Sequence, residues 1–256
     1  MRLSLLKEKG QVFMSRWYTR YMEGHYRAVY EDLCAMGEHV FDDQVEDEAV
    51  QVARAMMRRV RRNAEVLVAR LREVGYRFGA GFLDELTAEE RLQVEQDAPI
   101  LGIPARLAPE RVQQLEHLVG TLPLSLRCWY EEVGSINLIG LFPAMSPETG
   151  MKLEPLFISS LEVALRMGNL HGERDPTLAL APDNAYKYGY GGDAPYSVKL
   201  PSKSFDVPLL YEPHQGTLVD YLRVCFLWGG FPGLEHQKNV LPGDILPRLT
   251  EGLLPF

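Results

Sequence analysis

The sequence predicts an α+β fold in which helices flank a mostly antiparallel sheet, preceded by an N-terminal helical arm or hairpin. Two observations lead to this prediction. All 17 prolines fall after position 98, so no proline interrupts a helix before that point. Beyond it, short β-branched and apolar runs alternate with glycine and proline turns, a pattern typical of strands. We therefore divide the chain into a helical arm (1–85), a connector (86–106) and an α+β domain (107–256).

Two long helices are expected in the arm. Apolar and aromatic residues recur in steps of three and four from residue 11 to 36, which predicts a helix that Gly37 ends. A second helix is predicted over 42–74, because acidic residues open it, arginines follow, and its apolar residues share one face. At about 1.5 Å per residue it would be about 45 Å long, so we expect it to pack lengthwise against the first.

The remaining elements are shorter. Thr87 and Glu90 have the spacing of a capping box for a short helix in the connector. Pro109 suits the first turn of a helix and Thr217 suits an N-cap. Further helices are predicted at 109–120, 123–134, 161–167 and 217–227. Strands are predicted at 136–142, 152–158, 177–181, 196–200 and 207–211, and the tail after Leu234 is expected to be irregular.

Composition indicates a folded, acidic protein. The chain is 46% hydrophobic and 24% charged, with a net charge of -8. Residues 1–80 carry a net +2 and residues 81–256 a net -10, and so acidic a surface disfavours nucleic-acid binding. The three cysteines form no CxxC pair, which disfavours disulfides and zinc ribbons. We find neither a signal peptide nor an apolar stretch long enough to span a membrane, so we expect a cytoplasmic protein.

No motif for catalysis or for a cofactor stands out. The six histidines are far apart and form no HExxH or HxH pair, so we expect no metal site. Cys225 lies between His214 and His236 with Asp220 nearby, which leaves a thiol-dependent hydrolase or transferase as a minor alternative. A packed cysteine on an apolar helix face is the commoner case. We therefore expect no enzyme, no catalytic residue and no cofactor.

The glycine-rich segment 186–193 is the best candidate for a contact surface. It lacks the GxxxxGK[ST] order of a phosphate loop, so we interpret it as a turn between two strands. Its tyrosines would present amphipathic faces at low entropic cost. The candidate partner-binding residues are Asp183, Tyr186, Tyr188, Tyr190 and Asp193, with Glu131 and Glu132 as neighbours.

One basic cluster lies in the second predicted helix. It comprises Arg54, Arg58, Arg59, Arg61 and Arg62. Such a cluster could grip phosphates, but the acidic start of the helix and Glu65 within one turn favour an ordinary solvated face.

Three stretches of residues 107–235 resemble the SUKH superfamily, which includes the fungal Smi/Knr cell-wall regulators and many bacterial immunity proteins. The first is Leu122–Arg127 with Trp129, Tyr130, Val133 and Gly134, similar to the family's LP-x-x-L helix before its first strand. The second is Ala181–Asn184 with Gly192, Pro195, Tyr196, Leu200 and Pro201, and the third is Thr217, Leu218, Tyr221, Leu222 and Trp228–Gly233. Gly134 is followed by Ser135 where a second glycine is usual, and residues 1–100 have no counterpart in the family module.

The resemblance implies an α+β domain that binds a protein partner and performs no catalysis. Many bacterial members neutralise a protein toxin, often a nuclease, so the expected partner is a toxin domain. The acidic second part of the chain would suit the basic groove of a nuclease. The alternative is a regulatory or scaffold protein that uses the helical arm for protein contacts or dimerisation.

Overall fold

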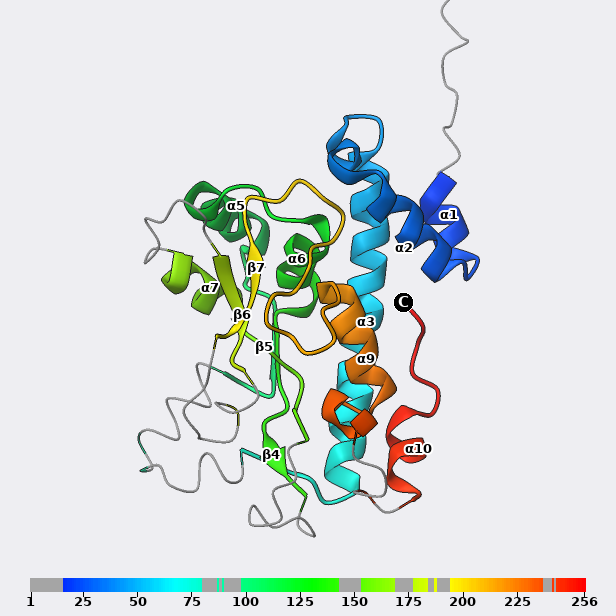
Figure 1. The fold of residues 1–256 in the computed structure, drawn as a ribbon, viewed down its shortest axis with the longest axis vertical. Coiled ribbons are helices and arrows are strands. Elements are labelled where there is room, and N and C mark those ends of the chain that lie inside the picture. The colour runs from blue at the N-terminus through cyan, green and yellow to red at the C-terminus, as the bar shows by residue number, and fades with distance from the viewer. Residues whose placement is uncertain are drawn as a thin grey trace, which may run out of the picture.

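The computed structural model describes residues 16–79, 87, 89, 98–142, 153–168, 177–183, 187, 194–236, 241 and 243–256. Figure 1 shows a long helix, α3 (Glu46–Glu73), with the strands and α5–α7 on one side of it. The short N-terminal helices lie beside its first half, and α10 lies beside its second half. The fold is therefore mixed, with helices around small antiparallel sheets, as the sequence predicts.

The helical part differs from prediction in its first element. Residues 16–35 form two helices, α1 (Arg16–Met22) and α2 (Tyr26–Ala35), where one was predicted. Gly24 separates them with a φ of +102°, a conformation that β-carbon sterics disfavour in other residues. After α2 the chain forms a 3₁₀ helix, η1 (Gly37–Phe41). The predicted second helix is confirmed as α3, 28 residues long with acids in its first turn.

Helices of the second part follow the predicted positions closely, apart from the tail. The predicted helices appear as α5 (Ala108–Val119), α6 (Leu124–Cys128) continued by the π-helical η2 (Trp129–Val133), α7 (Leu161–Gly168) and α9 (Leu218–Leu227). Thr217 caps α9, accepting a hydrogen bond from the Asp220 amide at 3.2 Å. The expectation of an irregular tail is wrong, since η4 (Pro232–His236) and α10 (Ile245–Thr250) form there. Packing stabilises α10: Leu249 is fully buried, and Arg70 of α3 donates to its carbonyl oxygen.

In the part of the chain that the structure describes, seven short strands form three antiparallel sheets. β1 (Arg77–Phe78) pairs with β4 (Gly140–Leu141), and β6 (Thr177–Ala181) pairs with β7 (Tyr196–Lys199). β3 (Ser135–Asn137) lies between β2 (Leu101–Gly102) and β5 (Phe157–Ile158). The Ser159 amide also donates to the Leu180 carbonyl oxygen at 2.8 Å, which joins the end of β5 to β6.

The predicted strand 136–142 is wrong as a single element, because it divides into β3 and β4 in different sheets. The Asn137 side chain causes the break by accepting a hydrogen bond from the amide of Ile139, two residues later. Predicted strand 152–158 is reduced to β5, and 207–211 forms only isolated bridges at Pro208 and Leu210. Glu90 of the predicted capping box lies outside the described residues.

One hydrophobic core includes the helices predicted as an arm. Buried residues of α3 pack in the same cluster as those of η2, β3 and α9. Gly230, after α9, shows how close this packing is: a β-carbon there would lie 2.8 Å from Leu138 Cδ1 and 3.1 Å from Leu67 Cδ2. In the described residues, α3 is thus a central element of the core.

Within the ranges that the structure describes, no helix is both long and apolar enough to cross a membrane.

Candidate functional site

A cavity of about 500 Å³ opens between α7 and the strands β3, β5 and β6. Its walls are largely apolar. They include Ile136, Phe157, Val163, Met167 and Leu180. A hollow of this size and lining suits an apolar side chain of a partner or a small apolar molecule.

Described residues on both sides of the predicted contact segment line the cavity. They are Asp183 and Pro195. Asp183 is half-buried. Of the other predicted residues, Tyr186, Tyr188, Tyr190 and Asp193 lie outside the described residues. The described ends of the segment therefore place its attachment points, and no more, at the cavity.

Two serines that line the cavity have side-chain oxygens that are buried. Ser135 and Ser159 line the cavity, yet within the described part of the chain neither side-chain oxygen has a hydrogen-bond partner. The Ser135 oxygen points toward Gly102 of β2, where a β-carbon would lie only 2.1 Å from it. These hydroxyls are inaccessible, so the surface that a ligand would meet is mainly apolar.

Lys187, a member of the predicted contact segment, is buried in the core. It is 1% exposed, and its Nζ lies 4.0 Å from Glu154 Oε1 and 4.8 Å from the ring centre of Tyr196. Burial lowers the pKa of this lysine, and the charge of Glu154 opposes that shift. Tyr196 also donates to Glu154 at 2.6 Å. Sequence reasoning missed this anchor, because lysine is rarely buried and nothing local marks the exception.

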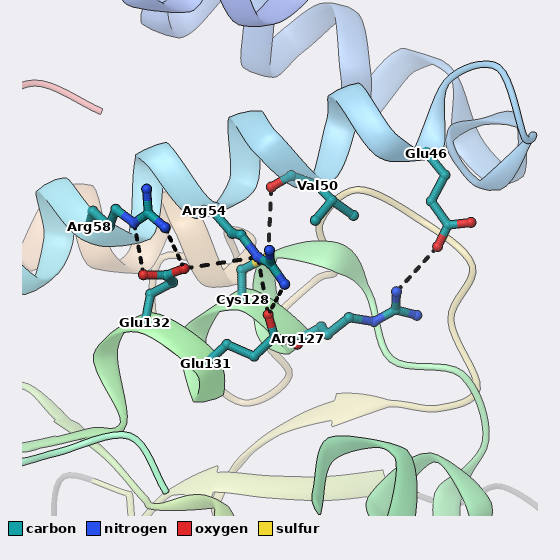
Figure 2. Close-up of polar contacts among 8 residues, drawn as sticks. All are labelled: Glu46, Val50, Arg54, Arg58, Arg127, Cys128, Glu131 and Glu132. Carbon is teal, nitrogen blue, oxygen red and sulfur yellow. Dashed lines mark hydrogen bonds and ion pairs between the residues drawn. The ribbon is translucent and has the colours of Figure 1, made fainter. Parts of the chain in front are cut away.

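Glu131 and Glu132, predicted neighbours of the contact surface, lie against α3. Figure 2 shows both carboxylates pointing at arginines of that helix. Arg54 Nη2 is 2.8 Å from Glu131, and Arg58 donates to both oxygens of Glu132 at 2.9 and 3.1 Å. The Glu131 side chain is only 9% exposed. These two carboxylates therefore join η2 to α3.

The other members of the arginine cluster also have partners within the molecule. Arg61 donates to the carbonyl oxygens of Gly102 and Val133 at 2.5 and 3.0 Å, and it pairs with Glu65. Arg62 also pairs with Glu65, whereas Arg59 stacks on Tyr26 with its guanidinium 4.4 Å from the ring centre. These contacts argue against a phosphate-binding stripe, because each arginine of the cluster already has at least one partner inside the molecule.

The cysteines lie in environments that suppress their reactivity. All three are free thiols, and Cys128 and Cys225 are buried. Burial raises the pKa of Cys225 well above its usual range and that of Cys128 to about 12. Since the thiolate is the nucleophile, these thiols are poorly suited to attack a substrate near neutral pH.

His214, the other member of the possible thiol arrangement, is held by two carboxylates. Its Nδ1 contacts Glu212 and its Nε2 lies 2.8 Å from Glu235 Oε1. Burial alone would lower the pKa of His214, but hydrogen bonds and charges from Glu212 and Glu235 raise it above its usual value. Both ring nitrogens are thus engaged, and the contacts join the 212–214 turn to η4.

Among the described residues, no three His, Cys, Asp or Glu side chains are grouped so that they could hold a metal ion. Comparison with known proteins gives no similar chain: no family model matches, and neither the curated proteins nor the solved structures contain a significant match. The candidate site therefore depends on geometry alone.

Proposed function

We propose that this chain is a cytoplasmic protein-binding module, similar to the SUKH immunity proteins, that neutralises a protein toxin, for which a nuclease is the best candidate. One observation carries the proposal. Asp183 and Pro195, which flank the predicted tyrosine segment, line the same apolar cavity. An apolar hollow, aromatic side chains and acidic groups thus belong to one continuous region of the chain.

This combination fits the usual anatomy of a protein interface. An apolar side chain of the partner would enter the cavity as an anchor, and the tyrosines predicted from the sequence would add amphipathic contacts. Asp183 and Asp193, together with the net charge of -10 over residues 81–256, would attract a basic partner surface and accelerate association. Glu131 and Glu132 are left out of this interface, since α3 already holds them.

The alternative, a scaffold protein that binds through its helical arm, has less support. Much of the arm is committed to the core: eleven residues of α3 are buried, and its arginines hold η2. Removing residues 1–80 would therefore unfold the protein and could not separate the two functions. Surface substitutions are the better test.

The proposal is tested by co-expressing the chain with a toxin candidate encoded beside it, scoring cell survival and complex formation. The double variant Asp183→Lys with Asp193→Lys should slow association by roughly tenfold and weaken its salt dependence, because attraction over long range would be lost. Asp43→Lys with Glu73→Lys is the matched control. It changes the net charge equally at exposed positions outside the cavity.

Stopped-flow or surface-based kinetics would give the association rates at two salt concentrations. If both double variants slowed association equally, Asp183 and Asp193 would not belong to the interface. Survival no better than with empty vector, together with no complex, would reject the toxin tested as the partner.

A further inference from the structure

The cavity between α7 and β6 is larger than one side chain of a partner would fill. Its volume is about 500 Å³. An apolar cavity of about 150 Å³ is enough to bind benzene, which is close in size to one phenyl group. The cavity therefore has room for two or three rings, and its volume is typical of small-molecule sites in proteins. Figure 1 shows α7 beside β6, the helix and strand that form two of its walls.

Small residues on the sheet side create this space. Ala179 and Ala181 of β6 line the cavity, and so does Ser159, which follows β5. On the opposite side, Val163 and Met167 line it from α7, where they are one helical turn apart. A helix and paired strands thus hold the hollow in place, so a ligand would find the site already formed.

The polar groups of the lining are largely used inside the protein. Asn137 Nδ2 donates to the Ala98 carbonyl oxygen at 2.8 Å, and its Oδ1 accepts from the Ile139 amide at 3.0 Å. The Ser160 hydroxyl oxygen accepts from the Val163 amide at 3.4 Å. The two other serine oxygens of the lining are buried, as described above. A ligand would therefore be held mainly by its apolar area.

The charge of the lining disfavours anions. Among the described residues that line the cavity, Asp183 is the only charged one, and none is lysine, arginine or histidine. A sulfonate, carboxylate or phosphate group would lose its hydration there, and no cation among these residues would offset that loss. The favoured ligand is therefore uncharged.

Two side chains of the wall favour aromatic rings. Phe157 of β5 and Met167 of α7 both line the cavity, and both are partly buried hydrophobic residues packed against the core. Aromatic rings pack favourably against one another edge-on or offset, and a methionine sulfur makes favourable contacts with ring edges. Met167 is also unbranched, so it can adapt its shape to a ligand.

From its size, lining and charge we propose that the cavity is a binding site for an uncharged aromatic molecule of two or three rings. This inference goes beyond the proposed function, because binding of such a molecule requires no partner protein. One consequence rests on the proposed function: the molecule would occupy the space that the partner's anchor needs, so the two would compete.

The test uses the full-length chain and N-phenyl-1-naphthylamine, an uncharged three-ring probe whose fluorescence rises in apolar surroundings. The wild type should bind it saturably, one to one, at micromolar concentrations. The anionic analogue 8-anilino-1-naphthalenesulfonate has the same rings and should bind at least roughly tenfold more weakly. Naphthalene should displace the probe roughly threefold more effectively than decalin, its saturated counterpart. Fluorescence titration measures all these affinities.

Two variants that fill the cavity locate the bound probe. Ala179→Phe on β6 and Val163→Trp on α7 should each weaken probe binding by roughly tenfold or more, because each places a ring in the space that the probe needs. They lie on opposite walls, so one remains decisive if the other fails to fold. Ala69→Phe is the matched control, since Ala69 is exposed on α3 outside the cavity. It should leave the affinity unchanged, and circular dichroism checks that each variant is folded.

Four results would overturn the proposal. One is no saturable binding of N-phenyl-1-naphthylamine to the folded wild type. A second is binding of the sulfonate that is as tight as that of the uncharged probe. A third is unchanged affinity in folded Ala179→Phe and Val163→Trp, and a fourth is equal displacement by naphthalene and decalin. None of these results would count against the toxin-binding function, which is scored separately by cell survival and complex formation.

Discussion

At the scale of single residues, buried and half-buried ionisable groups connect segments that lie far apart in the sequence. Asp206 is an example: it accepts hydrogen bonds from Tyr30, Ser125 and the Val219 amide at 2.9, 2.6 and 3.1 Å. It thereby joins α2, α6 and α9. Burial raises the pKa of Asp206, although the hydrogen bonds from Ser125 and the Val219 amide favour its charged form. Lys187 and His214 are further cases in which one ionisable group connects separate segments.

The raised pKa of His214 predicts that the free energy of unfolding depends on pH. Because its pKa is raised in the folded state, its protonated form stabilises the fold below the unfolded-state pKa, and this contribution is lost as pH rises through the folded-state pKa. The destabilisation caused by His214→Gln should therefore be largest at about pH 6 and should shrink at alkaline pH. Urea unfolding at several pH values measures it.

His117, which is exposed, provides the control for that experiment. His117→Gln is the exposed reference with which the His214→Gln profile is compared. A His214→Gln effect that stays constant from acidic to alkaline pH would contradict the assigned ion pairs with Glu212 and Glu235.

Long-range partners of single residues are what the sequence predicts least. The acids of the α3 first turn and the Thr217 cap were predictable, because both act within one helical turn. The partners of Glu131 and Lys187 were not, since Arg54 is 77 residues away from the first and Glu154 is 33 away from the second. Composition and spacing carry no information about contacts at such separations.

At the scale of elements, α3 is the helix on which the rest is assembled. One face supplies core residues, and its arginines reach η2, the carbonyl oxygens of Gly102 and Val133, and α10. Arginine suits this position because its planar, delocalised charge forms several directed hydrogen bonds while its stem packs against apolar neighbours.

The pairs formed by Arg54 and Arg58 should differ in strength. Arg54→Ala would leave the nearly buried Glu131 without its cation and should cost about 2–3 kcal/mol. Arg58 is 66% exposed and its partner is less buried, so Arg58→Ala should cost less than about 1 kcal/mol. Chemical denaturation compares the two with Arg62→Ala as a surface reference. Equal decreases in the free energy of unfolding for Arg54→Ala and Arg58→Ala would show that the burial of Glu131 does not strengthen its ion pair.

Helices were predicted better than strands for a physical reason. Periodicity identifies a helix because its core face repeats over many residues, as in α3 and α5. The strands here are two to five residues long, too short to show alternation. Pairing with distant segments decides their limits, so 136–142 divides between two sheets and 207–211 forms bridges only.

At the scale of the whole molecule, the helical and α+β parts should unfold together. They share one core, and the three tryptophans sample different parts of it: Trp17 and Trp228 pack against the core at separate places, and Trp129 is fully buried. We expect a single urea transition in which tryptophan fluorescence and far-ultraviolet circular dichroism coincide. Two separated transitions would instead mean that residues 16–73 form an independent unit.

The position of Lys187 has a consequence for chemical labelling. Acylating reagents modify only the neutral, accessible amine, so a lysine sealed in the core is protected from them even though burial lowers its pKa. The rate at which Lys187 is modified would therefore report how often local opening exposes its amine.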